Sequence, residues 1–197
     1  MGKKIVEGFK NINDMEIFER GLFTYNPMIF YLWKVGVNLA LRVSDVLNIR
    51  IDEAVDYLET GEYKSKDIKT GKLNHVKLNK NTKEAFVKAL NLRKTKTNLE
   101  NNEFLFVGLG NRSWSYEKSM TRQTVDRAFK HIVDMENIKI DIGTHTMRKT
   151  WGYMAYKKTK NIELVMKRLN HSSPGTTMAY IGITNKDIDL LVEELNI

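Results

Sequence analysis

Cysteine is absent from this chain of 197 residues, which excludes a disulfide framework and a thiolate metal site. Long apolar runs are absent as well, and the longest falls far short of the roughly 20 residues that a membrane span requires. The first residues, Met-Gly-Lys-Lys, lack the apolar stretch of a secretory signal peptide. These absences predict a soluble, cytoplasmic protein with no membrane partner.

Negative charge is in the minority, with 24 acidic residues against 32 Lys and Arg, a net charge of +8 and a pI near 9.5. Such a balance favours a polyanionic partner, although many basic proteins bind no nucleic acid specifically. The acidic residues gather after Ile183, where Asp187, Asp189, Glu193 and Glu194 outnumber a single lysine. The remainder of the chain is therefore more basic than the average, as a DNA-tracking surface requires.

Apolar residues recur at helical spacing along most of the chain, and 42% of all residues are hydrophobic, enough for the core of one domain. This pattern predicts a mostly α-helical protein with a small antiparallel β-sheet, an α+β fold. Residues 1–11 are expected to be a flexible lead, and residues 57–78 to form strands around a turn at Thr70-Gly71. The expected helices begin at Asn13 or Asp14, at Pro27, after Ser44 and Asn81 as caps, at Ser119, at Asn161 and after Ser173, with a last one in the tail.

The stretch from Thr144 to Ile183 concentrates the side chains that can carry chemistry. His145 and Arg148 are three residues apart and can share one helix face, His171 falls in a turn between two helices, and Tyr180 falls at the end of the second. A phenol with a pKa of about 10 is a poor nucleophile unless its target is strongly stabilised. Arginine binds phosphate through a planar fork, and imidazole donates hydrogen bonds or moves protons. The set therefore suits attack of a tyrosine on a phosphodiester without requiring a metal.

This stretch resembles the carboxy-terminal half of the catalytic domain of the tyrosine recombinases, the phage integrase family. The family pattern is His-x-x-Arg, then Gly-His or Asn-His, then the nucleophilic tyrosine. It also includes an arginine in a segment of the type Gly-Leu-Arg-Ile-Ser-Glu-Leu and a lysine in a β-hairpin turn. Their counterparts here are Arg42, within Leu41–Leu47, and Lys69, in Lys69-Thr70-Gly71-Lys72. All six positions occur in family order across nearly the whole chain.

The resemblance implies a bacterial or phage-encoded site-specific recombinase or integrase of a mobile element, with the tyrosine recombinase catalytic-domain fold. It would cleave and rejoin DNA through a 3′-phosphotyrosyl intermediate, with Tyr180 as nucleophile and neither metal nor cofactor. Arg42 and Arg148 would clamp the phosphate, Lys69 would protonate the leaving oxygen, His145 would accept a proton or bind the phosphate, and His171 would donate a hydrogen bond. A different hairpin register would place Lys66 or Lys72 in the role of Lys69.

Single motifs leave other interpretations open. Taken alone, Arg42 would be read as a structural arginine paired with Asp45 or Asp52, and Asp45 replaces the more usual glutamate of this segment. A metal held by His145 and His171 is disfavoured by the cation of Arg148 between them. A catalytically silent DNA-binding regulator and a type IB topoisomerase-like enzyme are the alternative functions. The complete catalytic set and the spacing after Leu169 favour the recombinase.

Residues 1–197 are expected to form one catalytic domain, because too few residues precede Arg42 for the amino-terminal core-binding domain of the family. The partner would be double-stranded DNA, on which the protein forms a homo-oligomer with accessory DNA-bending proteins. The acidic, amphipathic helix at residues 185–197 would dock onto a neighbouring protomer. Basic side chains expected to contact the DNA backbone are Lys72, Lys83, Arg122, Arg127 and Lys130.

Overall fold

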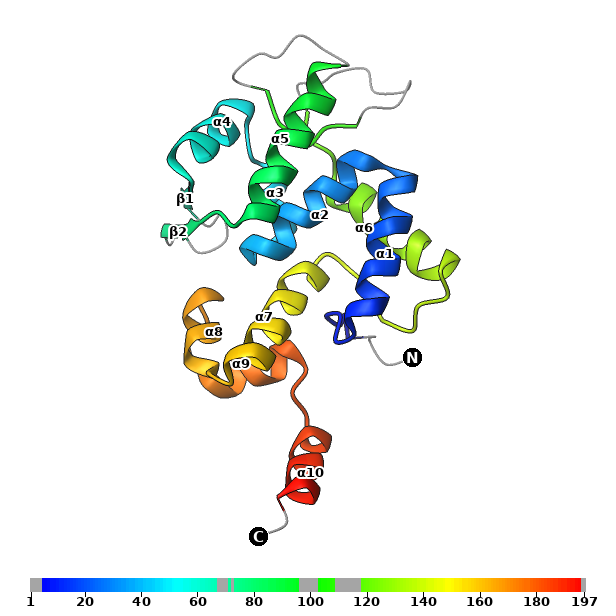
Figure 1. The fold of residues 1–197 in the computed structure, drawn as a ribbon, viewed down its shortest axis with the longest axis vertical. Helices are drawn as coiled ribbons and strands as arrows, with labels where there is room; N and C mark the ends of the chain where they lie inside the picture. Colours follow the sequence, from blue (N-terminus) through cyan, green and yellow to red (C-terminus); the bar gives the residue numbers. More distant parts are fainter. Residues whose placement is uncertain (1–4, 67–70, 72, 96–102, 109–117, 196–197) are drawn as a thin grey trace.

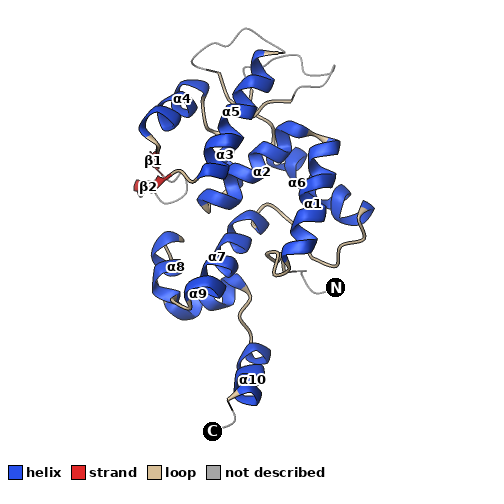
Figure 2. Ribbon diagram, viewed as in Figure 1, coloured by secondary structure: helices blue, strands red, loops and turns tan. Residues whose placement is uncertain are grey.

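The computed structural model describes residues 5–66, 71, 73–95, 103–108 and 118–195. These residues form helices and one two-stranded antiparallel sheet (Figures 1 and 2), so the predicted mostly α fold with a small sheet is confirmed. The elements in chain order are α1 (Ile12–Tyr25), α2 (Pro27–Leu39), α3 (Val43–Leu47), α4 (Ile51–Thr60), β1 (Glu62–Lys66), β2 (Leu73–Lys77), α5 (Lys80–Lys94), α6 (Arg122–Met135), α7 (Thr146–Thr159), α8 (Ile162–Arg168), α9 (Pro174–Ile181) and α10 (Asn185–Glu194).

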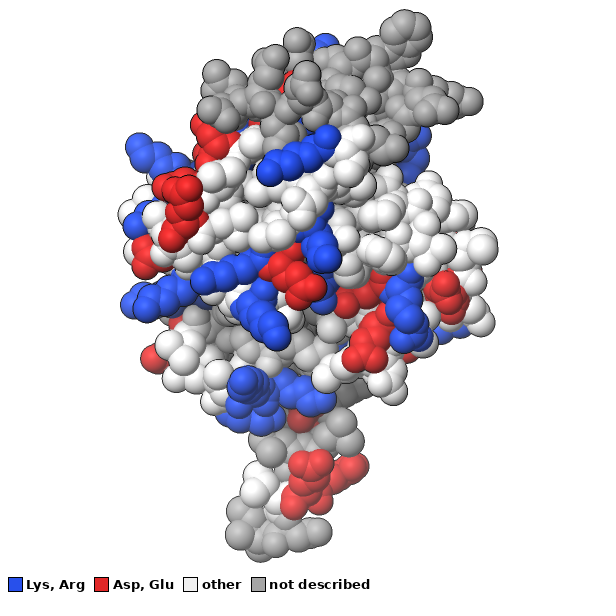
Figure 3. Space-filling view, turned by 45° about the horizontal axis from the view of Figure 1, so that its top comes forward, with Lys and Arg blue, Asp and Glu red and all other residues white. Residues whose placement is uncertain are grey.

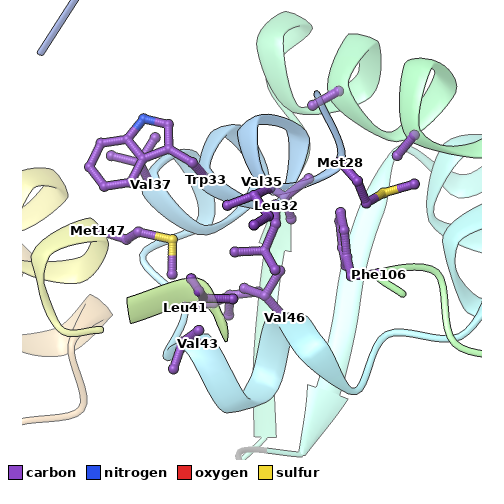
Figure 4. Packing of buried hydrophobic residues seen from close by; sticks show 14 of the residues in the cluster. Met28, Leu32, Trp33, Val35, Val37, Leu41, Val43, Val46, Phe106 and Met147 are labelled. Carbon is purple, nitrogen blue, oxygen red and sulfur yellow. The ribbon is translucent and has the colours of Figure 1, made fainter. Parts of the chain in front are cut away.

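Helix α2 runs through the centre of the larger core and packs against α1, α5 and α7. It begins where the Asn26 side chain accepts hydrogen bonds from two backbone amides, with Pro27 in its first turn. Figure 4 shows Trp33 of this helix near Met147 of α7, with Leu32, apolar residues of α3 and the buried Phe106 in the same core. Because α2 is apolar on nearly every face, it fixes the position of the residues that follow it.

A smaller apolar cluster lies below this core, where α7, α8 and α9 pack together. Its buried members are Ala40, Val165, Leu169 and Ile181. Ala40 ends α2 in the left-handed conformation, with φ of 51°, which turns the chain toward α3. The cluster therefore joins the end of α2 to the helices that carry the second half of the predicted site.

Residues 5–11 pack against the body of the protein and do not form the free lead expected from the sequence. Phe9 is 1% exposed and stacks on Phe18 and Trp33 in the larger core. Its backbone amide donates to Thr150 Oγ1 of α7 at 2.9 Å, and the Lys10 ammonium donates to the carbonyl of Gly182 at 2.8 Å. The buried Phe9 and these two hydrogen bonds anchor the segment.

Several predicted element boundaries are wrong. Residues 57–60 belong to helix α4, so the strands begin only at Glu62, and their register pairs Glu62 with Lys77. Ser44 lies inside α3, which starts without a side-chain cap, and α5 is capped by Asn79 rather than by Asn81. Helix ends are the least certain part of a pattern read from sequence, because several nearby polar residues can serve as the cap.

Helix α10 extends away from the other helices at the carboxyl end, on the far side of Gly182 (Figure 1). Gly182 has φ of 78° and ends α9, and the Asp187 carboxylate accepts a hydrogen bond from the Thr184 amide at 2.7 Å. Among the described residues, no helix is both long and apolar enough to cross a membrane. The predicted tail helix is thus present, and Val192 within it and Leu195 directly after it are exposed.

Candidate active site

Three side chains that are distant in sequence meet where α7 begins and α9 ends. His145 directly precedes α7, and Tyr180 is the penultimate residue of α9. The Nδ1 atom of His145 lies 3.3 Å from the Tyr180 hydroxyl. The ring of His171 stands edge-on to the Tyr180 ring, with 4.9 Å between centroids and 80° between the planes. The structure therefore brings together the two histidines and the tyrosine that the sequence singled out.

Local sequence explains why His171 and Tyr180 face each other. Helix α8 ends at Arg168, and Asn170, two residues later, has the left-handed conformation predicted for it, with φ of 52°. Helix α9 then starts at Ser173, whose hydroxyl accepts from the Thr176 amide, as predicted. His171 lies in this short turn, and its Nδ1 atom is 3.2 Å from Thr177 Oγ1. The turn thus fixes the imidazole beside the helix that carries Tyr180.

Arg148 is almost entirely buried, at 3% exposure, in the first turn of α7. Its Nη1 donates to the carbonyl of Ala40 at 2.7 Å, and its Nη2 donates to the carbonyl of Leu169. One guanidinium thus connects the end of α2, the end of α8 and the start of α7. A guanidinium has five N–H donors, so this anchoring leaves others for a ligand.

Arg42 reaches the same place from the junction between α2 and α3, where it is half-buried. Its positive charge acts to lower the pKa values of Arg148, Tyr180 and both histidines. Asp45, one turn further on, is buried, and its charge acts to raise the pKa of Arg148. The predicted pair of arginines is therefore gathered around the tyrosine.

Burial and positive charge set the protonation of this cluster. Burial raises the pKa of Tyr180, while the charges of Arg148 and Arg42 act to lower it. Burial also lowers the pKa of His145, and the neighbouring cations, Arg122 first among them, lower it further. The pKa of His171 is lowered by burial and by the same two arginines. Both imidazoles are consequently held neutral at pH values where an ordinary histidine begins to protonate.

The described residues include only one of the three lysines considered for the role of acid. Lys69 and Lys72 lie outside the described residues, so their predicted roles stay predictions. Lys66, the alternative acid, is exposed at the end of β1. Within the described part of the chain, no three His, Cys, Asp or Glu side chains are close enough to share a metal ion.

The predicted DNA-contacting residues divide into two groups. Arg122 lies beside the site, because its Nη2 is 3.4 Å from Thr144 Oγ1 and its charge acts on His145. Arg127 and Lys83 are exposed on α6 and α5, and Lys130 pairs with Asp126 at 2.6 Å. Only Arg122 of these is thus part of the cluster around Tyr180.

Sequence reasoning missed two basic residues. The Lys149 ammonium lies 4.9 Å from the centroid of the Tyr180 ring. Its spacing of four residues from His145 was a signal that could have identified it. Arg168 donates to Asn74 Oδ1 of β2 at 2.5 Å and to the carbonyl of Leu39, which connects α8 to the hairpin. Its position on a short amphipathic helix gave no indication of that contact.

Comparison with known proteins agrees with this geometry. The sequence pattern of the Phage integrase family matches residues 29–186. A "Probable integrase/recombinase YoeC" of Bacillus subtilis (strain 168) is 31% identical over 181 residues, which is 91% of this chain and 91% of that protein. A "Tyrosine recombinase" of Thermosipho africanus (strain TCF52B) is 31% identical over 71 residues, 36% of this chain and 25% of that one.

Solved structures share the fold. The XerA recombinase superposes with a TM-score of 0.73 at 17% identity, over 98% of this chain and 67% of that one. A lambda integrase (residues 75–356), solved as a dimer bound to a COC′ core site, gives a TM-score of 0.66 at 14% identity, over 93% of this chain and 63% of that one. Family pattern, relative and fold agree, and the chain belongs to the phage integrase family, the tyrosine-type site-specific recombinases.

Proposed function

We propose that this protein cleaves and rejoins double-stranded DNA through a covalent bond between Tyr180 and a 3′-phosphate. The observation that carries the proposal is the Tyr180 hydroxyl, 3.3 Å from His145 Nδ1 and close to the charges of Arg148 and Arg42. A nucleophile within reach of a proton acceptor and beside two fixed cations suits phosphoryl transfer.

In the cleavage step, the Tyr180 oxygen attacks phosphorus and forms a new ester bond. The bond between phosphorus and the 5′-oxygen breaks, so that one DNA end remains attached to the protein and the other ends in a 5′-hydroxyl. His145 takes the phenol proton, for which its lowered pKa keeps it available. The reverse attack by a 5′-hydroxyl rejoins DNA, since the ester conserves the bond energy.

Arg148 and Arg42 stabilise the negative charge that develops on the non-bridging oxygens. The anchoring of Arg148 to two carbonyls supports this role, because a donor that is already oriented needs no reorganisation when the substrate arrives. Removing one such donor typically costs about 10²–10³ in rate. Lys69 is the proposed acid for the leaving 5′-oxygen, and His171 the proposed hydrogen-bond donor to the phosphate.

The surface charge supports a DNA partner. Figure 3 shows Lys and Arg side chains across the middle of one face, and acidic side chains at the end that protrudes below it. In this proposal Arg122, Arg127, Lys130 and Lys83 contact the phosphate backbone. Residues 1–197 act as one catalytic domain, and the acidic α10 docks onto a second copy when the protein assembles on DNA with DNA-bending proteins.

A covalent-adduct assay on supercoiled plasmid in EDTA tests the reaction. The wild-type protein should yield an adduct that survives SDS, or relaxed plasmid, and Tyr180→Phe should yield neither while binding DNA equally well. Tyr25→Phe, which changes an exposed tyrosine on α1, is the matched control and should behave as wild type.

The outcomes separate the candidate functions. Adduct that persists in Tyr180→Phe would assign the nucleophile to another residue. DNA binding by wild type with no adduct, repeated on a nicked substrate, would favour the silent regulator. Relaxation of plasmids of unrelated sequence at equal rates would favour the topoisomerase-like activity.

A further inference from the structure

Lys149 lies against the face of the Tyr180 ring. Its ammonium is 4.9 Å from the ring centroid, a distance at which a cation is attracted to an aromatic face. The edge of His171 meets the same ring, and the hydroxyl lies near His145. Tyr180 also shares a side-chain hydrogen bond with Arg148. Of these neighbours of the phenol, Lys149 lies outside the predicted catalytic set.

The fold directs Lys149 to this position. Its backbone amide donates to the carbonyl of His145 at 3.0 Å, so the two side chains lie one turn apart on the same face of α7. The amino-terminal segment closes the other side, because a Cβ on Gly8 would come within 2.6 Å of the Lys149 carbonyl carbon. The backbone amide of Phe9 donates a hydrogen bond to the hydroxyl of Thr150, the residue after Lys149. The half-buried lysine is thus kept between this segment and α9.

The charge of Lys149 acts on the proposed proton acceptor. It disfavours protonation of His145, whose pKa it helps to lower after burial and Arg122. The charges that lower the pKa of Tyr180 against the effect of burial are those of Arg148 and Arg42. Burial lowers the pKa of Lys149 itself, and the charge of Glu7 opposes that change. The charged and titratable groups facing this cluster are Glu7, Arg42, Arg122, His145, Arg148, Lys149, His171 and Tyr180.

We propose that Lys149 is a positioning residue for strand cleavage: it holds the Tyr180 ring and keeps His145 free to accept the phenol proton. The inference rests on the proposed function for its effect on cleavage, but the contact itself can be tested on the protein alone.

The first measurement is an NMR titration of the histidine rings, of which the chain has four. Lys149→Met removes the charge and keeps the length of the side chain, so the His145 midpoint should move to higher pH. Lys149→Arg should leave the midpoint near the wild-type value. Lys157→Met makes the same change at an exposed position in the last turn of α7 and should shift nothing.

The second measurement is the rate of adduct formation against pH for the same variants. Lys149→Met should slow cleavage on the order of tenfold near neutral pH and move the rising limb of the profile to higher pH, and Lys149→Arg should restore both. The inference is overturned if the His145 midpoint does not move in Lys149→Met. It is also overturned if Lys149→Met slows cleavage without shifting the rising limb and Lys149→Arg does not restore the rate. Wild-type protein that forms no Tyr180-dependent adduct overturns the proposed function instead, while the titration still decides the contact.

Discussion

The guanidinium of Arg148 is buried and is held by the protein itself. Its contacts with the carbonyls of Ala40 and Leu169 hold three helix ends together and orient the guanidinium beside Tyr180. In the proposed mechanism the same residue serves stability and chemistry, and the two contributions can be separated experimentally.

Arg148→Lys should retain the charge but lose the planar fork, since an ammonium cannot bond both carbonyls and a phosphate in this geometry. We expect the free energy of unfolding to fall by about 1–3 kcal/mol, because a buried carbonyl loses its donor. Adduct formation should fall by roughly 10²–10³, with DNA binding nearly unchanged. Chemical denaturation and the plasmid assay measure the two effects.

Arg20→Lys, an exposed exchange on α1, is the control and should alter neither quantity. Full activity in a destabilised Arg148→Lys protein would show that the arginine is purely structural.

The sequence identified most of this cluster because motif spacing and helix caps are local. His145, Arg148, His171 and Tyr180 sit where cap residues and helical periodicity place them, and the structure brings them together. The sequence did not identify Lys149 and Arg168 because the side chains and carbonyls that they contact lie on other elements. Basic residues on amphipathic helices are common, and only the tertiary arrangement distinguishes a contact from a solvated charge.

At the scale of elements, the hairpin depends on a polar residue at a buried strand position. Asn74 is 4% exposed on β2 and accepts a hydrogen bond from Arg168 of α8. Burial and the charge of Arg148 lower the pKa of Arg168 to about 10, so it remains charged at neutral pH. The contact connects the strands that enclose residues 67–72 to the helix end that anchors Arg148.

Asn74→Ala should loosen the hairpin by removing a buried acceptor from a charged donor. We expect a loss of about 1.5–3 kcal/mol in unfolding free energy and slower strand cleavage, because the predicted acid Lys69 lies between these strands in sequence. Hydrogen exchange of the β1 and β2 amides, together with the adduct assay, reports the change.

His75→Ala is the matched comparison, since it breaks an exposed contact with Glu62 one residue further along β2. If both variants affected cleavage equally, the link through Arg168 would have no special role.

Element boundaries were less predictable than element types. The end of helix α4 was predicted as strand because Val, Tyr and Thr occur there, and these residues are common in strands. The helix forms because it buries Ile51, Ala54 and Tyr57 on one face. The hydrophobic period of α2 was unambiguous, and its limits were predicted within one residue.

At the scale of the whole molecule, α10 stands apart from the remaining helices (Figure 1). Val192 and Leu195 are 67% and 55% exposed, beside the acidic Glu193 and Glu194. An acidic helix with exposed apolar side chains is better suited to a protein surface than to DNA.

Deletion of residues 185–197 should leave the thermal midpoint within a few degrees of wild type and abolish assembly of several copies on DNA. Light scattering of the protein–DNA complexes, at matched salt, measures the assembly. A shortened protein that still forms the larger complexes would contradict the docking role of α10.

The amino-terminal segment has a consequence for the order in which the protein can fold during synthesis. The backbone amide of Phe9 hydrogen-bonds to Thr150, 141 residues later in the chain, and the Lys10 ammonium hydrogen-bonds to Gly182, 172 residues later. Such distant closures come late, because the intervening chain must be made and ordered first. The Phe9 ring finds Phe18 and Trp33 early, whereas its backbone amide and the Lys10 ammonium reach their partners much later. Because Tyr180 lies on α9, which ends directly before Gly182, we expect its ring to be fixed in place only after these late contacts have formed.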